Sequence, residues 1–471
     1  NIAIGRQAGY DLTSGTYNFF GGYAAGFNAT TADHTIAIGR LAIGVGVLTG
    51  TDNIAIGYAA GNDLTSGTYN NLMGYRAGYN ITEGGHNVLQ GYQVCLNATT
   101  ASNTIAIGKS AIGLGVLTGT DNTAIGYQAG YDLTSGTYNN FMGLQAGYNA
   151  TTADNTIAIG RLALGLGVLT GTDNIAIGHQ AGYDLTSGTY NNFMGYSAGA
   201  NATTASYTVA IGYEAIGTGV LTGADNTVIG RQAGQDLTSG TYNFFGGFRA
   251  GYNATTSDSN IAIGQNAIGL GVLTGDNNVA VGRSAGYDLT SGATNVFVGY
   301  LAGSNVTTGA DNTILGPNSG DALTTGSNNT IIGHDAAASA VDVSNEITFG
   351  NASISAIRAQ VTSISALSDR RDKKDIKELP VGLDFINSLN PVEFTWNMRD
   401  GAKVGQKEAG FIAQELDEAQ QNAGVEELMN LVLKTNPDRL EAAPGKLIPI
   451  LVKAIQELSA EVKSLKLCKC N

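Results

Sequence analysis

Charged residues, cysteine, proline and tryptophan are all scarce in this chain. Of its 471 residues only 13% are Asp, Glu, Lys or Arg, and it has 3 cysteines, 6 prolines and 1 tryptophan. Three cysteines cannot form a disulfide framework, and Cys468 and Cys470 lack the further Cys or His ligands that a zinc site needs. We interpret these two and Cys95 as incidental, with an interchain bridge at the tail as the alternative.

Long apolar runs and basic segments are also missing. No run approaches the roughly 18 apolar residues that a membrane-spanning helix requires, and no secretory signal is visible. Of the net charge of -14, -13 falls on residues 1–350. Because an acidic surface repels phosphate backbones and anionic lipids, we expect no nucleic-acid partner and no membrane insertion. The chain begins at Asn1 without Met, so we expect it to be a fragment that lacks its upstream attachment segment.

Glycine is abundant, with 67 copies, and it recurs at a nearly fixed interval. The pattern Asn/Thr-x-x-x-Gly-x-x-Ala aligns residues 1–350 into 21 consecutive 17-residue or 18-residue units, each with Gly at its fifth position. So short a period is typical of a solenoid, in which each unit covers the apolar face of the one before it. The segment Asn1–Gly5 and its copies are β-branched runs bounded by turn residues, which predicts a strand of about five residues per unit.

The repeated positions also predict how successive units meet. The leading Asn side chains should form a hydrogen-bonded ladder, and the fifth-position Gly suits a positive φ or a close backbone approach. Rungs about 4.8 Å apart would make a rod on the order of 100 Å long. The units come in triplets, two 17-residue units followed by one 18-residue unit, and one extra unit that begins at Asn87 interrupts this order. Because that insertion would rotate all later faces of a three-unit coil, we expect one unit per coil.

Tyrosine recurs at the tenth position of the units, and two interpretations are open. Rows of exposed rings could stack on sugars, or the rings could stack on one another along the rod, which we favour. The four histidines lie in separate units, no carboxylate pair stands out as a glycosidase dyad, and a lone carboxylate per rung is weak evidence for calcium. We therefore expect no metal site and no cofactor. The tyrosines are Tyr10, Tyr79, Tyr131, Tyr148, Tyr183, Tyr252 and Tyr287.

The composition changes after the repeats end. Residues 351–471 carry 17 acidic and 16 basic residues together with the single tryptophan, and they do not repeat. We therefore divide the chain into a repeat shaft at 1–350, a linker at 351–367 and a small domain at 368–471.

The small domain opens on a serine and a lysine that could act together. No histidine lies in residues 335–471, which excludes a Ser/His pair there and leaves Ser368 and Lys373 as a candidate dyad. A lysine can take the proton of a serine hydroxyl only when it is uncharged, and nearby cations favour that form. The alternative is that the Ser-Asp pair caps a turn and the basic cluster is a solvated face.

Four blocks of this region, at 368–376, 389–396, 410–416 and 447–451, together resemble the intramolecular chaperone auto-processing domain of phage tailspikes and tail fibres of the endosialidase type. The resemblance implies a small α+β domain that assembles trimers. It also implies that this domain is a serine endopeptidase that cuts its own chain once and is thereby released.

The same resemblance implies a role for each residue of the first block. The cut would fall between Leu367 and Ser368, with Ser368 as the nucleophile, Lys373 as the general base, and Asp369 and Arg371 in support. Asp372 departs from the family pattern, because an apolar residue is more often expected there.

The repeat units resemble the Asn-x-Ala-Ile-Gly repeats of trimeric autotransporter adhesin heads and of many phage fibres. In the adhesin heads such repeats form parallel β-rolls packed as trimers. The two resemblances imply a mainly β chain: a trimeric parallel β-solenoid shaft of a phage tail fibre, made in the host cytoplasm and carried on the virion. Its partner would be a host cell-surface receptor, with a glycan as one candidate. The alternative is a bacterial trimeric surface adhesin with the same chaperone domain.

Near the C-terminus, apolar residues recur every three or four positions, which is typical of an a/d coiled-coil seam. Two interpretations are open: the seam joins three chains, or one amphipathic helix packs on its own domain. The resemblance favours a trimeric coiled coil. The seam residues are Ile448, Leu451, Ile455, Leu458, Val462 and Leu465.

Overall fold

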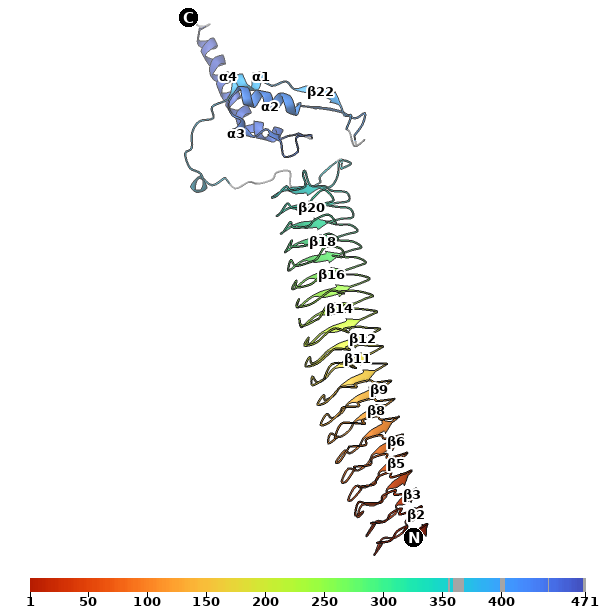
Figure 1. Ribbon diagram of the computed structural model, residues 1–471. Helices are drawn as coiled ribbons and strands as arrows, with labels where there is room; N and C mark the ends of the chain where they lie inside the picture. Colours follow the sequence, from red (N-terminus) through yellow and green to blue (C-terminus); the bar gives the residue numbers. More distant parts are fainter. Residues whose placement is uncertain (355, 359–367, 399–402, 439, 469–471) are drawn as a thin grey trace.

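Figure 1 shows a computed structural model in which a long stack of coils is followed by a small domain that contains the helices. The structure describes residues 1–354, 356–358, 368–398, 403–438 and 440–468. Within these ranges, no helix combines the length and the apolar character that crossing a membrane would take.

The stack is a single parallel sheet of 21 short strands, one from each repeat unit. Each strand has three residues rather than the five that we expected. The reason is the fifth-position Gly, whose positive φ takes the backbone out of the β region and ends the strand. The strands are β1 (Ile2–Ile4), β2 (Phe19–Gly21), β3 (Ile36–Ile38), β4 (Ile54–Ile56), β5 (Asn71–Met73), β6 (Val88–Gln90), β7 (Ile105–Ile107), β8 (Thr123–Ile125), β9 (Asn140–Met142), β10 (Ile157–Ile159), β11 (Ile175–Ile177), β12 (Asn192–Met194), β13 (Val209–Ile211), β14 (Thr227–Ile229), β15 (Phe244–Gly246), β16 (Ile261–Ile263), β17 (Val279–Val281), β18 (Val296–Val298), β19 (Thr313–Leu315), β20 (Thr330–Ile332) and β21 (Ile347–Phe349).

Each strand pairs with the next strand in the sequence, so one unit makes one coil, as predicted. Ile2 lies opposite Phe19, and the same in-phase pairing continues to Thr330 and Ile347. The extra unit adds β6 between β5 and β7. The coils after it are not rotated relative to those before it, because Leu89 pairs in register with the middle residues of β5 and β7. The shaft therefore keeps the same sides along its whole length.

The core of the shaft contains a column of small side chains with larger ones placed among them. From β2 to β20 the middle residue of each strand is buried, and Phe141 is fully buried between Ala124 and Ala158 on the neighbouring strands. Glycines at positive φ fit against its ring: a Cβ at Gly147 would lie 2.7 Å from the ring. Phe20, Phe193, Phe245 and Phe297 are buried in the same way.

The fifth-position glycines show both of the features predicted for them, a positive φ and a close approach to the backbone of the next coil. In the first 20 units their φ lies between +127° and +143°. They also touch the next coil, since a Cβ on Gly195 would lie 2.3 Å from the carbonyl oxygen of Gly212. The backbone conformation and the close approach both require Gly at this position.

The predicted asparagine ladder is present inside the shaft. The Asn53 Oδ1 accepts hydrogen bonds from the backbone N–H of Asn70 (3.1 Å) and from its Nδ2 (3.0 Å), and Asn70 Nδ2 also donates to the Gly84 carbonyl (2.9 Å). The longest run extends from Asn226 to Asn329. Threonine at Thr35, Thr104, Thr156 and Thr208 interrupts the ladder.

The predicted aromatic stacking along the rod is confirmed, although it runs in short groups rather than in one long row. At the tenth position Tyr10 stacks on Phe27 and Tyr131 stacks on Tyr148, with centroids 5.2 and 5.0 Å apart. These rows break where the longer units have glycine at the tenth position, as at Gly44. Two further columns stack at other positions: Tyr58–Tyr75–Tyr92 and His179–Tyr196–Tyr213 on one side, and Tyr17–His34, Tyr69–His86 and Tyr190–Tyr207 on another.

The C-terminal region is a small α+β domain. Its core joins Phe385, Leu416, Val425, Met429, Leu431, Val432, Leu447 and Ile450. Its elements are the 3-10 helix η1 (Arg370–Asp372), α1 (Leu383–Ser388), β22 (Val392–Thr395), β23 (Lys407–Gly410), α2 (Ala413–Asn422), α3 (Glu426–Met429), β24 (Val432–Leu433), β25 (Glu441–Ala442), the 3-10 helix η2 (Pro444–Leu447) and α4 (Ile448–Cys468). β22 pairs antiparallel with β23, and β24 pairs antiparallel with β25.

Candidate functional site

The first block of the C-terminal domain folds around Asp369. Its carboxylate accepts a hydrogen bond from the Arg371 backbone N–H (2.8 Å) and caps η1. The same carboxylate pairs with the Arg371 guanidinium at 2.6 Å. These bonds from the Arg371 side chain and backbone hold the pKa of Asp369 below its usual value. The capping role that we considered as an alternative is therefore real, and Asp369 fills it rather than Ser368.

Ser368 and Lys373 meet across this capped turn. The Lys373 Nζ donates a hydrogen bond to the Ser368 Oγ at 2.6 Å. The turn brings them together because η1 spans only three residues and the Lys373 backbone N–H closes it by donating to the Arg370 carbonyl (3.2 Å). The candidate nucleophile and the candidate base thus lie within hydrogen-bond reach of each other, and the Asp369–Arg371 pair lies in the turn between them.

A single chain leaves this dyad open to solvent. Ser368, Lys373 and the intervening residues are all exposed. Asp372, where the resemblance leads us to expect an apolar residue, is exposed as well. Leu367, on the other side of the predicted cut, lies outside the described residues.

The last helix, α4, has two apolar faces, of which one is buried and the other is exposed. On one face Ile450 and Ala454 are buried, and Ile450 lies in the domain core together with Leu447 of η2, the residue just before α4. All six residues of the predicted seam are exposed, from 41% at Leu451 to 65% at Ile455. The helix does pack on its own domain, but it does so through other residues than the seam, so the seam remains uncovered in one chain.

Two side chains on α4 fix the helix to the domain beneath it. The Glu457 carboxylate accepts a hydrogen bond from the Leu383 backbone N–H (2.7 Å) at the start of α1. Lys453 donates to the Leu379 carbonyl. A carboxylate at a helix N-terminus accepts otherwise unpaired N–H groups and interacts favourably with the helix dipole. These contacts hold α4 in one orientation, with the seam facing outward.

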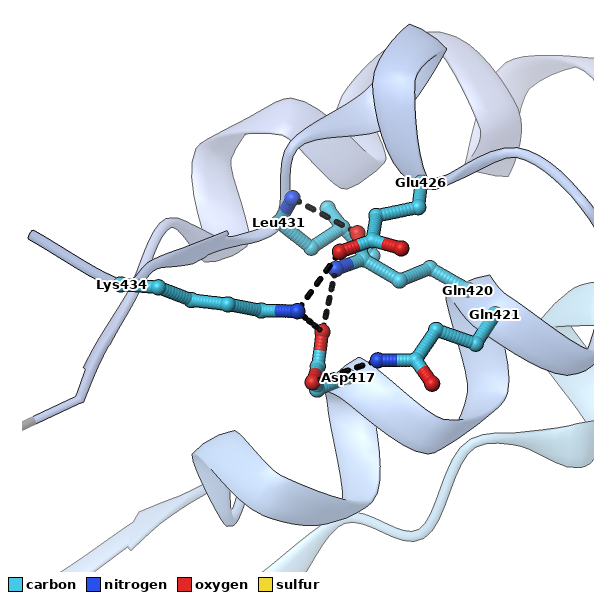
Figure 2. Close-up of polar contacts among 6 residues, drawn as sticks. All are labelled: Asp417, Gln420, Gln421, Glu426, Leu431 and Lys434. Atoms are coloured by element: carbon cyan, nitrogen blue, oxygen red, sulfur yellow. Dashed lines mark hydrogen bonds and ion pairs between the residues drawn. The ribbon is translucent and has the colours of Figure 1, made fainter. Parts of the chain in front are cut away.

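Figure 2 shows a polar cluster that ties α2 and α3 to the two residues that flank β24, Leu431 and Lys434. Lys434 bridges Asp417 on α2 (2.7 Å) and Glu426 on α3 (2.6 Å). The buried Gln420 donates to Asp417 (2.9 Å) and accepts from the Leu431 backbone N–H (2.9 Å). We did not predict this cluster from the sequence, because its members are separated by irregular intervals and share no motif. It positions the residues that pack beneath α4.

The lowered pKa of Asp417 in this cluster predicts that the domain loses stability in acid. Burial raises the pKa of Asp417, but hydrogen bonds from Lys434, Gln420 and Gln421 outweigh this effect and leave it below its usual value. A carboxyl whose pKa is lowered by folding stabilises the fold above the pKa of the unfolded chain, about 3.9, and this contribution is lost as the pH falls through the folded value.

We therefore expect the urea midpoint of this domain to be lower at about pH 3 than at about pH 5. Fluorescence of Trp396, the single tryptophan, reports this domain specifically. Asp417→Asn should lower the midpoint at the higher pH and reduce its dependence on pH. Glu427→Gln, an exposed neighbour on α3, should keep the dependence of the unaltered protein; an Asp417→Asn protein with the same dependence would contradict the assignment.

The cysteines and the possible metal ligands are the remaining candidate residues. Cys95 is a free thiol, and its complete burial raises its pKa and removes it from reaction. Cys470 and the side chain of Cys468 lie outside the described residues. Among the residues that the structure describes, no three His, Cys, Asp or Glu side chains gather as they would around a metal ion.

Comparison with known proteins bears on the C-terminal region. A search of curated proteins gives no match. Residues 368–425 match the family model described as chaperone of endosialidase. The match begins at Ser368 and ends just after α2. The chain thus combines a 21-coil parallel β-solenoid shaft with a C-terminal region of the endosialidase-chaperone type.

Proposed function

We propose that this chain is the trimeric shaft of a phage tail fibre, carried on the virion and used for host attachment, and that its C-terminal domain assembles the trimer and then cuts itself off. The observation that carries the proposal is the 2.6 Å contact between Lys373 Nζ and Ser368 Oγ at the first residue of the chaperone-like region. A nucleophile placed there separates the chaperone from the shaft when it cuts.

The cleavage would proceed in two steps. The Ser368 Oγ attacks the carbonyl carbon of the preceding peptide bond while the uncharged Lys373 amine takes the hydroxyl proton. The carbon–nitrogen bond breaks, the proton passes to the departing amine, and the shaft is left as an ester on Ser368. Water then hydrolyses the ester, which gives a shaft ending in a carboxylate and a released domain beginning with Ser368.

The exposure of the dyad supports coupling of this reaction to assembly. A lysine serves as a base only when uncharged, and burial favours the uncharged form. In one chain Ser368 and Lys373 are exposed, whereas neighbouring chains in a trimer would cover them. The cut would then follow assembly and not precede it.

The need for such a chaperone follows from the repeats. Coils that are nearly identical can pair one step out of register at little local cost, and unpaired strand edges are prone to aggregation. A clamp at one end, built from three copies of α4 meeting through the exposed seam, sets the starting register. After its release, the shaft would be held by a high barrier to unfolding.

Leu458→Asp tests this proposal on the full-length protein. A charge in the seam should leave a chain with the mass of a monomer in light scattering and should also abolish cleavage in intact mass spectrometry. Ala460→Asp, which places the same charge on the side of α4 away from the seam, should leave assembly and cleavage unchanged. If Leu458→Asp still gives a trimer, α4 is not the clamp; if it is monomeric and still cut, cleavage does not depend on assembly.

A further inference from the structure

The five coils that are built from 18-residue units each expose a pair of side chains, almost all of them apolar, at the same place on the shaft. We call each pair a ridge. Nine of the ten side chains are valine or leucine, with exposed fractions between 53% and 57%, and the tenth is an exposed threonine. The ridges are Val45/Val47, Leu114/Val116, Leu166/Val168, Thr218/Val220 and Leu270/Val272, on the coils of β3, β7, β10, β13 and β16.

Each ridge is the place where its coil accommodates the extra residue of the longer unit. The Asn28 side chain donates to the Val45 carbonyl, 17 residues ahead (2.7 Å), but the Thr30 backbone N–H donates to the Leu48 carbonyl (3.1 Å), an interval longer by one residue. The extra residue therefore lies between these two bonds as a bulge. The same change of interval occurs at the other four ridges, for example between Asn149→Leu166 and Thr151→Leu169.

The bulge is held firmly from both neighbouring coils. On one side Asn28 binds it, and on the other the backbone N–H groups of Val45 and Gly46 both donate to the Asn62 carbonyl at 2.9 Å. Gly46 fits tightly, because a Cβ there would lie 2.3 Å from the Leu64 carbonyl oxygen. The apolar pair is thus presented on a fixed backbone, which lowers the entropy lost when a partner binds.

The ridge segments carry no ionisable residue, although the shaft as a whole is strongly acidic. Two acidic shafts repel each other, so copies of this chain can approach most closely where charge is absent. The uncharged segments are residues 41–51, 110–120, 162–172, 215–224 and 266–275.

The ridges are unevenly spaced along the shaft. The step from β3 to β7 is four coils, because it contains the extra unit with β6, and the other three steps are three coils each. When one copy is shifted along another by one or two coils, no ridge meets a ridge. A shift of three coils brings three of the five together. Only two copies in the same register match all five.

We propose that the ridges are contacts between copies of this chain, each meeting its equivalent around the axis of a parallel trimer, and that their uneven spacing fixes the register along the shaft. The inference rests on the trimer of the proposed function and adds to it the surface that touches. It also gives the extra coil a role, since without it the ridges would repeat uniformly.

Cysteine cross-linking tests the contact. In the full-length chain with Cys468→Ser and Cys470→Ser, Val168→Cys should give covalent dimers under mild oxidation. Tyr196→Cys, on another side of the shaft and 46% exposed, should not. A trimer that cross-links through Tyr196→Cys but not through Val168→Cys would overturn the ridge contact alone, whereas a monomer in light scattering would overturn the trimer and the inference with it.

Co-assembly with deletion variants tests the register. Removing residues 87–103 or residues 295–311 takes out one coil in each case and leaves the C-terminal domain intact. If copies are aligned from the C-terminus, the first deletion leaves four of five ridges matched to those of the full-length chain, and the second displaces all five by one coil.

We expect the full-length chain to co-purify with the 87–103 deletion, and its co-purification with the 295–311 deletion to be at least tenfold lower, when two differently tagged chains are expressed together. Each deletion variant alone should form trimers, because its ridges match those of its own copies. Equal co-purification of both variants with the full-length chain would overturn the register role.

Discussion

Replacing Ser368 with alanine is expected to leave one full-length chain where the unaltered protein gives two fragments, residues 1–367 and 368–471. The hydroxyl is the proposed nucleophile, and Lys373 donates a hydrogen bond to it at 2.6 Å. Removing the nucleophile of a serine protease slows its reaction by a factor on the order of 10⁶. Denaturing electrophoresis and intact mass measurement give the result directly.

Two further variants separate chemistry from folding. Lys373→Met should also leave the chain uncut, because it removes the base and keeps much of the side-chain volume. Ser388→Ala removes a hydroxyl of the same domain that donates to the Phe385 carbonyl at 2.7 Å and should be cut normally. Cleavage of the Ser368→Ala chain at the same bond would refute the assignment of the nucleophile.

Replacing Gly195 with alanine is expected to destabilise the middle of the shaft strongly. The φ of +138° is one that L-residues rarely adopt, and the new Cβ would lie 2.3 Å from the Gly212 carbonyl oxygen. Strain of this kind costs about 3 kcal/mol, and because the opposing atom belongs to the backbone, the coils must separate to relieve it. Hydrogen exchange of β12 and β13 should accelerate on the order of 100-fold.

Ser197→Ala is the matched control, since Ser197 lies in the same turn at a φ of +51°. It already has a Cβ in that conformation, so the replacement adds no new clash. Its exchange rates should stay close to those of the unaltered shaft. Equal exchange in the Gly195→Ala and Ser197→Ala proteins would show that the close approach of the coils is not what demands glycine.

The repeat carried most of the information about the shaft. The extra unit that begins at Asn87 predicted one coil per unit, because it would have rotated the faces of a three-unit coil. The leading Asn predicted the ladder, because it occupies equivalent places in adjacent coils. The three-residue strands and the bulge at Val45–Leu48 were not predicted. The strand length depends on where the backbone turns at each glycine. The position of the bulge depends on where the hydrogen-bond interval between coils lengthens by one residue. The sequence of a single unit specifies neither the strand length nor the position of the bulge.

In the C-terminal domain, a contact between residues close in the sequence could be predicted, whereas contacts between distant residues could not. Ser368 and Lys373 are five residues apart, and the structure brings them together. The Lys434 bridge joins partners on two helices, and the Glu457 contact reaches a backbone N–H 74 residues away. Such contacts depend on how the helices pack, so no spacing within the sequence points to them.

The one-unit coil has a consequence for how fast the shaft forms. Every strand pairs only with strands one repeat unit away in the sequence, whatever the total number of coils. Chains with such local contacts fold quickly for their size, and in a stacked repeat each new coil adds to a finished edge. The slow event is therefore the formation of the first few coils, and a longer shaft of the same kind would need hardly more time to fold than a short one.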